Sequence, residues 1–161
     1  MYLDYDNLVL NYISAITYAC RTSDTFTLIT KMKKPFQKRP PVTIHDVYLS
    51  QLIPFLISQD FGIKKWPGTI TGDNHKLMNT YKVCKETEKI LKTYSNPFIF
   101  SPDMPEDICF WRKGQPWLVT TSHEKIAYFE NPTASDISFI ENGFLDTSSN
   151  NKLKSKRGKN R

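Results

Sequence analysis

Each of the three histidines lies within two residues of a carboxylate: His45 is next to Asp46, His75 follows Asp73 by two residues, and His123 is next to Glu124. Imidazole and carboxylate groups together can perform general acid–base catalysis or bind a metal ion. The pair at His123 also begins like the zinc-protease motif HExxH, whose second histidine follows four residues after the first. Ala127 occupies that position, so the sequence does not support a metalloprotease of this type.

Whether the histidines converge decides between an enzyme and a non-catalytic protein. If residues 61–75 folded back on the later part of the chain, His75 and His123 with Asp73 or Glu124 would form a general acid–base pair, as in a hydrolase or nuclease. The local interpretation is simpler. Asp and Asn in such loops ordinarily cap turns, and a His-Glu pair at a strand end ordinarily does the same or bonds a backbone carbonyl. We favour this interpretation and keep the enzyme as an alternative.

Signatures of other chemistry are missing from the sequence. It has no Walker loop, Rossmann glycine fingerprint, GxSxG elbow or kinase motif, so nucleotide-driven chemistry is not expected. Cys20, Cys84 and Cys109 are widely spaced, as is typical of reduced thiols in a cytoplasmic protein. We therefore expect no cofactor and no metal site. Asp4 and Asp6, together with the lack of an apolar run of about 20 residues, argue against a signal peptide or membrane span.

Tryptophans and an arginine concentrate in two segments that could bind another protein. Side chains alternate between the two faces of a strand, so Phe110 and Trp111 are expected on opposite faces. The face away from the core would then present an aromatic surface, unless the loop around Trp66 covers it. Because Trp and Arg anchor protein interfaces, the predicted binding residues are Trp66, Asp73, Trp111, Arg112 and Trp117.

The first half of the chain is predicted to be mainly helical. Apolar residues recur every three or four positions from Leu3 to Cys20, which predicts an amphipathic helix. The β-branched run over 25–32 predicts a strand. Helical spacing returns over 43–59, where Pro54 kinks or ends the helix. Three glycines and a proline predict a surface loop over 61–75.

The second half contains the clearest strand pattern. Residues 108–112 and 116–121 predict a β-hairpin around Gly114, and a strand over 126–129 extends it into a meander. Residues 76–84 are compatible with a strand or a helix, and the strand is preferred because 85–94 already form a short helix.

Thr133 and Asp136 resemble a capping box that opens a last helix over 135–141. Together these elements predict an α+β fold: an antiparallel sheet that includes the C-terminal hairpin and meander, packed with three or four helices in a single domain over 1–146.

The basic character of the sequence resides in its last residues. The formal net charge is +6. Residues 147–161 contain no acidic residue and six basic ones: Lys152, Lys154, Lys156, Arg157, Lys159 and Arg161. Without them, basic and acidic residues are equal in number. With Leu153 as the one apolar residue, this segment is predicted to be a disordered basic tail.

Two segments resemble known proteins of one class. The stretch PEDICFWRKGQPWLVTTSHE over 105–124 and the loop KWPGTITGDNH over 65–75 resemble uncharacterised small bacterial proteins similar to single-domain immunity proteins of polymorphic toxin systems. This resemblance implies a cytoplasmic inhibitor that binds one toxin domain and catalyses nothing. It assigns a functional role to no residue of this chain.

Three functions remain from the sequence. We favour a non-catalytic protein-binding module, of which an immunity protein is one example. The alternatives are a hydrolase or nuclease using His75, His123, Glu124 and Asp73, and a nucleic-acid-associated protein that contacts phosphates through its tail.

The first prediction concerns the tail. Because residues 147–161 cannot bury apolar surface, their deletion should leave the thermal midpoint within about 2 °C of the full chain. Calorimetry on both proteins measures this, and a larger fall would mean that the tail docks on the domain. If the tail binds nucleic acid, its deletion should also abolish salt-dependent retention on DNA.

Overall fold

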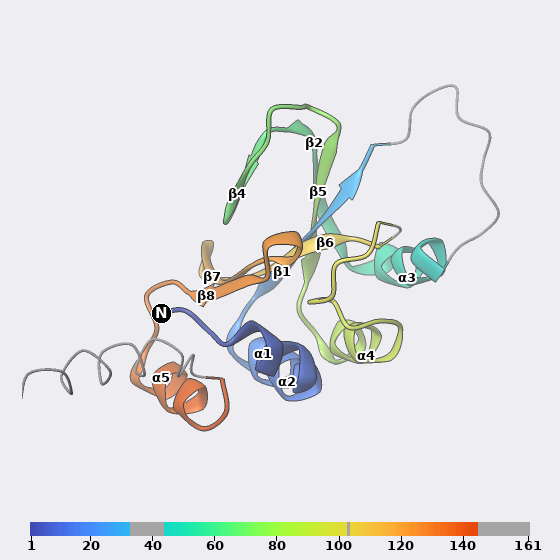
Figure 1. Cartoon of the computed structure of the whole chain (residues 1–161). Coiled ribbons are helices and arrows are strands. Elements are labelled where there is room, and N and C mark those ends of the chain that lie inside the picture. The colour runs from blue at the N-terminus through green and yellow to red at the C-terminus, as the bar shows by residue number, and fades with distance from the viewer. Residues whose placement is uncertain (33–43, 103, 145–161) are drawn as a thin grey trace, which may run out of the picture.

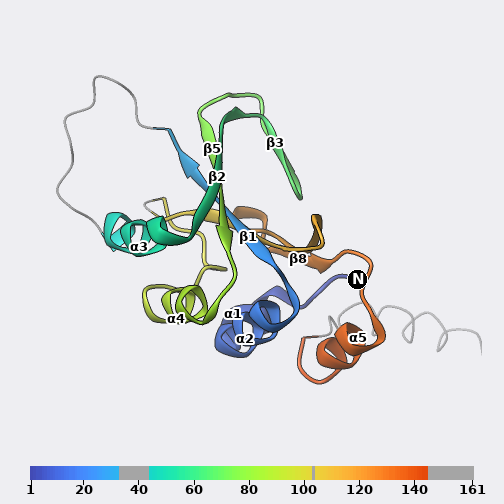
Figure 2. The same ribbon diagram turned by 180° about the vertical axis from the view of Figure 1, so that it is seen from behind.

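The large sheet has helices on one face and a small β-ribbon on the other. The computed structural model describes residues 1–32, 44–102 and 104–144. Within them, six antiparallel strands have the order β2-β5-β1-β6-β7-β8, and β3 pairs separately with β4. The helices lie together on one side of the sheet and the β3–β4 ribbon lies on the other (Figures 1 and 2). This is the predicted α+β fold. The predicted tail, 147–161, lies outside the described residues.

The large sheet consists of β1 (Thr25–Lys31), β2 (Leu56–Ile63), β5 (Lys76–Lys82), β6 (Glu106–Arg112), β7 (Gln115–Thr121) and β8 (Ile126–Phe129), and the ribbon of β3 (Lys65–Trp66) and β4 (Thr69–Ile70). The predicted hairpin and meander are present as β6, β7 and β8, with Gly114 at φ +74° in the first turn. Residues 76–82 form a strand, as preferred.

The described residues form five α-helices: α1 (Tyr5–Leu10), α2 (Tyr12–Thr22), α3 (Ile44–Leu52), α4 (Lys85–Thr93) and α5 (Ala134–Glu141). The single helix predicted over 3–20 is divided at Asn11, which ends α1 with non-helical angles. The Asn11 side chain donates to the Asn7 carbonyl, a local bond that competes with the helical pattern.

The helices pack on the sheet through one continuous apolar core. Leu8 of α1, Ile16 of α2 and Leu91 of α4 are buried in the same cluster as Phe26 of β1 and Phe110 of β6. The Phe26 ring lies between those of Tyr81, at 5.2 Å, and Phe110, at 5.8 Å, so aromatic contacts join three neighbouring strands.

Two predictions for residues 43–75 are wrong. The helix predicted to reach residue 59 ends at Leu52, because Pro54 follows in a short 3-10 turn and β2 begins at Leu56. The predicted loop over 61–75 contains the end of β2 and the whole ribbon. Pro67 and Gly68 form the ribbon's tight turn, in which Gly68 has φ +84°.

The buried carboxylate of Asp136 joins three parts of the fold. It accepts both terminal guanidinium nitrogens of Arg112 at 2.9 and 3.1 Å, and Nε1 of Trp117 at 3.1 Å. The Tyr18 hydroxyl donates to it at 2.7 Å, and Thr133 completes the predicted capping box. Burial acts to raise the pKa of Asp136, but the bonds from Arg112, Thr133 and Tyr18 outweigh burial and hold that pKa well below its usual range.

We predict that Asp136→Ala lowers the free energy of unfolding by about 3 kcal/mol, because it leaves Arg112 and the buried Trp117 N–H without their acceptor. Chemical denaturation near pH 7 measures the loss. Since the folded-state pKa of Asp136 is depressed, this stabilisation should be present above about pH 4 and decline as the pH falls further.

The matched control is Glu141→Ala, which removes an exposed carboxylate from the same helix and should change the free energy of unfolding by less than about 0.5 kcal/mol. Equal losses in the two variants, or an Asp136→Ala variant whose stability responds to acid as strongly as the wild type, would contradict the assigned role.

Candidate functional site

The predicted aromatic surface is largely internal. Trp66 is 6% exposed, and its Nε1 donates to Asp107 Oδ2 at 2.9 Å. Through this bond the ribbon covers the face of the sheet opposite the helices. Gly68 allows the close approach, since a Cβ there would lie 2.8 Å from Thr121 Oγ1 and 3.0 Å from Val119 Cγ1. The alternative that the Trp66 loop covers this face therefore holds.

Asp107 holds the ribbon from a bulge in β6. One extra residue enters β6 between the pairs Thr27–Cys109 and Ile29–Glu106, and Asp107 has φ +53°. Such a bulge redirects a side chain, and here the Asp107 carboxylate accepts from Trp66 and also from the backbone and hydroxyl of Ser122. Asp107 is 1% exposed, so these bonds stabilise a buried charge.

The other predicted anchors also have internal partners. Trp117 is 2% exposed, the Arg112 guanidinium lies 4.1 Å from its ring centre, and both bond Asp136. Trp111 is half-buried and donates to Thr27 Oγ1. The prediction that Trp66 and Trp117 are exposed binding residues is therefore wrong. Both rings are buried, and their N–H groups donate to Asp107 and Asp136 inside the protein.

The acidic and histidine residues of the enzyme alternative occupy separate local structures. Asp73 accepts the backbone N–H of His75 in an exposed turn. His123 Nε2 lies 3.6 Å from Glu124 Oε1, and both side chains are exposed. Within the described ranges, no hydrogen bond or ion pair joins His75 to His123, and no group of three or more His, Cys, Asp or Glu is placed to hold a metal ion.

The cysteines are free thiols inside or beside the core. Burial is the main cause that raises the pKa of Cys20 to about 12 and that raises the pKa of Cys109 still further. Neither thiol is a nucleophile near neutral pH.

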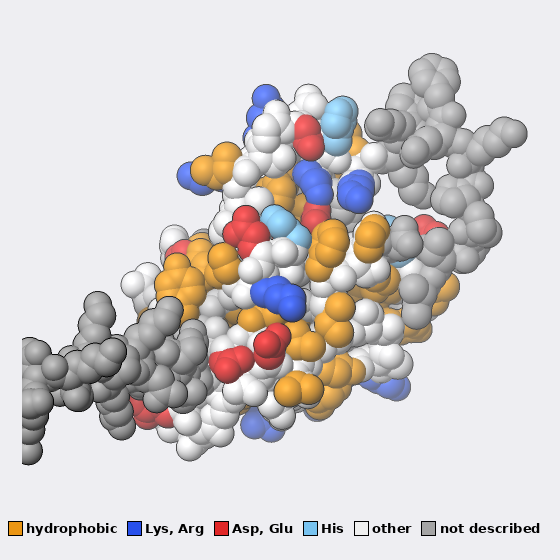
Figure 3. All heavy atoms as spheres, in the orientation of Figure 1, with side chains coloured by type: hydrophobic (Ala, Val, Ile, Leu, Met, Phe, Trp, Pro, Cys, Tyr) orange, Lys and Arg blue, Asp and Glu red, His pale blue; other side chains and the backbone are white. Residues whose placement is uncertain are grey.

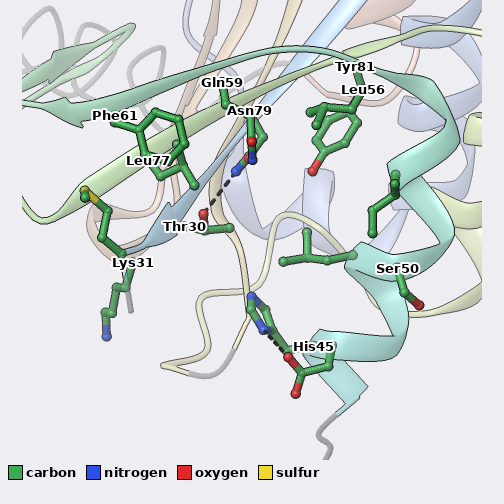
Figure 4. Close-up of a pocket in the computed structure, with 14 residues that line it drawn as sticks. Thr30, Lys31, His45, Ser50, Leu56, Gln59, Phe61, Leu77, Asn79 and Tyr81 are labelled. Atoms are coloured by element: carbon green, nitrogen blue, oxygen red, sulfur yellow. Dashed lines mark hydrogen bonds and ion pairs between the residues drawn. The ribbon is translucent and has the colours of Figure 1, made fainter. Parts of the chain in front are cut away.

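A pocket of about 480 Å³ opens between α3 and the strands β1, β5 and β2. Figure 4 shows Thr30, Asn79 and Gln59 from the three strands on one side of the pocket and His45 and Ser50 of α3 on the other. Lys31, Asp46 and Tyr81 also line the pocket, together with apolar side chains: Met32, Leu49, Ile53, Leu56, Phe61 and Leu77. An apolar hollow of this size with a few convergent polar groups is typical of a binding site.

The polar side of the pocket is a row of hydrogen bonds across three strands. Gln59 Nε2 donates to Asn79 Oδ1 at 2.8 Å, and Asn79 Nδ2 donates to Thr30 Oγ1 at 3.0 Å. Asn79 is 3% exposed and Thr30 is 7% exposed. Sequence reasoning missed this row. The available signal was Asn79 itself, a polar residue on the strand face that carries Leu77 and Tyr81.

The pocket lies beside the open edge of the sheet. At the far edge, residues 1–3 cover β8: the Leu3 N–H donates to the Ala127 carbonyl and the Phe129 N–H donates to the Met1 carbonyl, both at 2.9 Å. At the near edge, no strand among the described residues pairs with the outer side of β2. Ile53, Ile57 and Phe61 are 64%, 58% and 65% exposed there.

Comparisons of the chain with protein-family models, with curated proteins and with solved structures find no match. The described residues also contain no helix that is long and apolar enough to cross a membrane.

We predict that Trp66→Phe lowers the free energy of unfolding by about 1 to 3 kcal/mol, because the buried Asp107 carboxylate loses a donor while an aromatic ring is kept. The control is Trp111→Phe, which removes a bond to the neutral Thr27 hydroxyl and should cost about 1 kcal/mol or less. Urea denaturation compares the two variants. A Trp66→Phe loss no greater than that of the control would show that the Asp107 bond does not hold the ribbon.

Proposed function

We propose that this chain is a non-catalytic, cytoplasmic protein-binding module that takes an extended segment of its partner onto the outer side of β2. The observation that carries this proposal is that no described strand pairs with the outer side of β2, where Ile57 and Phe61, and Ile53 just before the strand, are exposed beside a pocket. Segments that add to a sheet edge gain affinity from backbone hydrogen bonds and specificity from side-chain pockets.

The charge on β2 defines the complementary segment. Asp60 is the one charged side chain of β2, and it is exposed between Gln59 and Phe61. Opposite Asp60, a Lys or Arg of the partner would contribute most to binding. Opposite Ile57 and Phe61, apolar residues would contribute most. The expected partner segment is therefore extended and apolar, with a basic residue near its centre.

A second copy of this chain suits the edge less well. Register shifts interrupt the β2–β5 pairing next to Ser58 and after Phe61. If two β2 strands paired around Asp60, two carboxylates would face each other, which is destabilising. If they paired around Gln59, only Ser58–Asp60 would pair regularly.

A toxin domain is the partner class that we propose, in keeping with the resemblance of residues 65–75 and 105–124 to immunity proteins. The surface does not favour nucleic acid as the partner of the described residues. On the face drawn in Figure 3, basic and acidic side chains are interspersed and form no large area of one sign, whereas phosphate binding uses clustered Lys and Arg.

We predict that Ile57→Lys and Phe61→Lys, made together, weaken binding of partner segments at least tenfold, since they remove apolar contacts and place cations opposite the expected apolar residues of the segment. A displayed library of ten-residue peptides, selected on the full chain and titrated by calorimetry, measures this. Enriched peptides should alternate apolar residues around a Lys or Arg.

The matched control is Ile70→Lys, an equally apolar and 77% exposed position on β4. Peptides that bind the edge variant as tightly as the wild type, or a selection with no enrichment, would overturn the proposal. Dimers in analytical ultracentrifugation that the edge variant abolishes would replace the partner by a second copy. If a toxin domain is encoded beside this gene, protection of cells that express that domain should be lost with the edge variant and kept with Ile70→Lys.

A further inference from the structure

One hydroxyl that faces the pocket has no hydrogen-bond partner among the described residues. Tyr81 of β5 is 4% exposed, and its ring points into the hollow with the hydroxyl foremost (Figure 4). Within the part of the chain that the structure describes, nothing donates to this oxygen or accepts its proton. Because this hydroxyl faces the pocket, water or a group of a ligand can complete its hydrogen bonds there.

The neighbouring polar groups leave complementary positions open. Thr30 Oγ1 accepts from Asn79, which leaves its own proton to donate. Gln59 uses Nε2 to donate to Asn79, which leaves Oε1 as an acceptor. Burial raises the pKa of Tyr81 to about 12, so its hydroxyl also stays a donor at neutral pH. These three side chains therefore offer two hydroxyl donors and one amide acceptor.

We propose that the pocket binds the phenol ring of a tyrosine in the partner segment that docks on β2, an inference that rests on the proposed function. The ring would lie against the apolar side chains of Leu49, Leu56 and Leu77. Its oxygen would accept from Tyr81 or Thr30 and donate to Gln59. A phenol oxygen can both accept and donate, so it is matched to this set of groups.

Other side chains match the pocket less well. An aliphatic side chain would leave the Tyr81 hydroxyl without a partner, and an indole N–H can only donate. A carboxylate would need a buried cation, whereas Lys31, the one Lys or Arg among the described lining residues, is exposed.

The experiment uses p-cresol and toluene, which differ only in the phenol hydroxyl, with the full chain labelled at Leu and Ile methyl groups. In NMR titrations p-cresol should shift the methyl resonances of Leu49 and Leu77 saturably, with a dissociation constant in the millimolar range expected of a small fragment. Toluene should bind about fivefold more weakly. Tyr81→Phe should weaken p-cresol binding about fivefold and leave toluene binding unchanged. Tyr2→Phe, at an exposed position outside the lining, is the control.

Equal affinity of the wild type for the two probes, or no saturable shift, would overturn the inference. If Tyr81→Phe does not fold, intermolecular nuclear Overhauser effects between p-cresol and the wild-type chain decide: contacts to Leu49 and Leu77 support the site, and contacts elsewhere overturn it. These probes need no partner. If p-cresol binds while edge variants keep full peptide affinity, the proposed function fails and the tyrosine pocket stands. If edge variants lose peptide affinity while p-cresol does not bind, the proposed function stands and the tyrosine pocket fails.

Discussion

The buried carboxylate of Asp136 is the interaction on which the joining of the meander to the helices depends. An anion in that position is stable only because Arg112 of β6, Trp117 of β7, Tyr18 of α2 and Thr133 at the start of α5 all donate to it. Each donor is directed inward by this one acceptor. The same bonds bury Trp117 and hold the half-buried Arg112 against its ring, so both side chains are used within the fold.

Elements defined by neighbouring residues could be predicted from the sequence, and contacts between distant residues could not. The β6–β7 hairpin and the capping box of α5 depend on residues a few positions apart, and both are present. β2 was missed because its residues include Gln, Asp and Gly, which have low strand propensity. Its pairing with the distant strand β5 stabilises it as a strand. The pocket was missed for the same reason: Thr30, Gln59 and Asn79 meet only after three strands have paired.

Both faces of the sheet are covered by other elements, whereas only one of its two edges is covered within the described residues. The helices bury one face, and the ribbon covers the other through the bond from Trp66 to Asp107. Residues 1–3 pair with β8 at one edge, while at the other edge no strand of the described ranges pairs with the outer side of β2. Natural sheets usually protect their edges with charges and bulges. β2 has one charge, Asp60, and two register shifts, and it still exposes Ile57 and Phe61. The protection is therefore partial.

The close approach of the ribbon has a consequence for recognising distant relatives. At position 68 any side chain would collide with Thr121 and Val119, and the backbone there has φ +84°. The bond from Trp66 also requires an acid at the bulge 41 residues later, and that acid in turn bonds Ser122, 15 residues further on. A tryptophan and a glycine two residues apart, followed at these intervals by an acid and a serine, form a sparse pattern set by geometry. Such a pattern can persist after overall sequence identity has decayed, so it can identify homologues that whole-chain comparison misses.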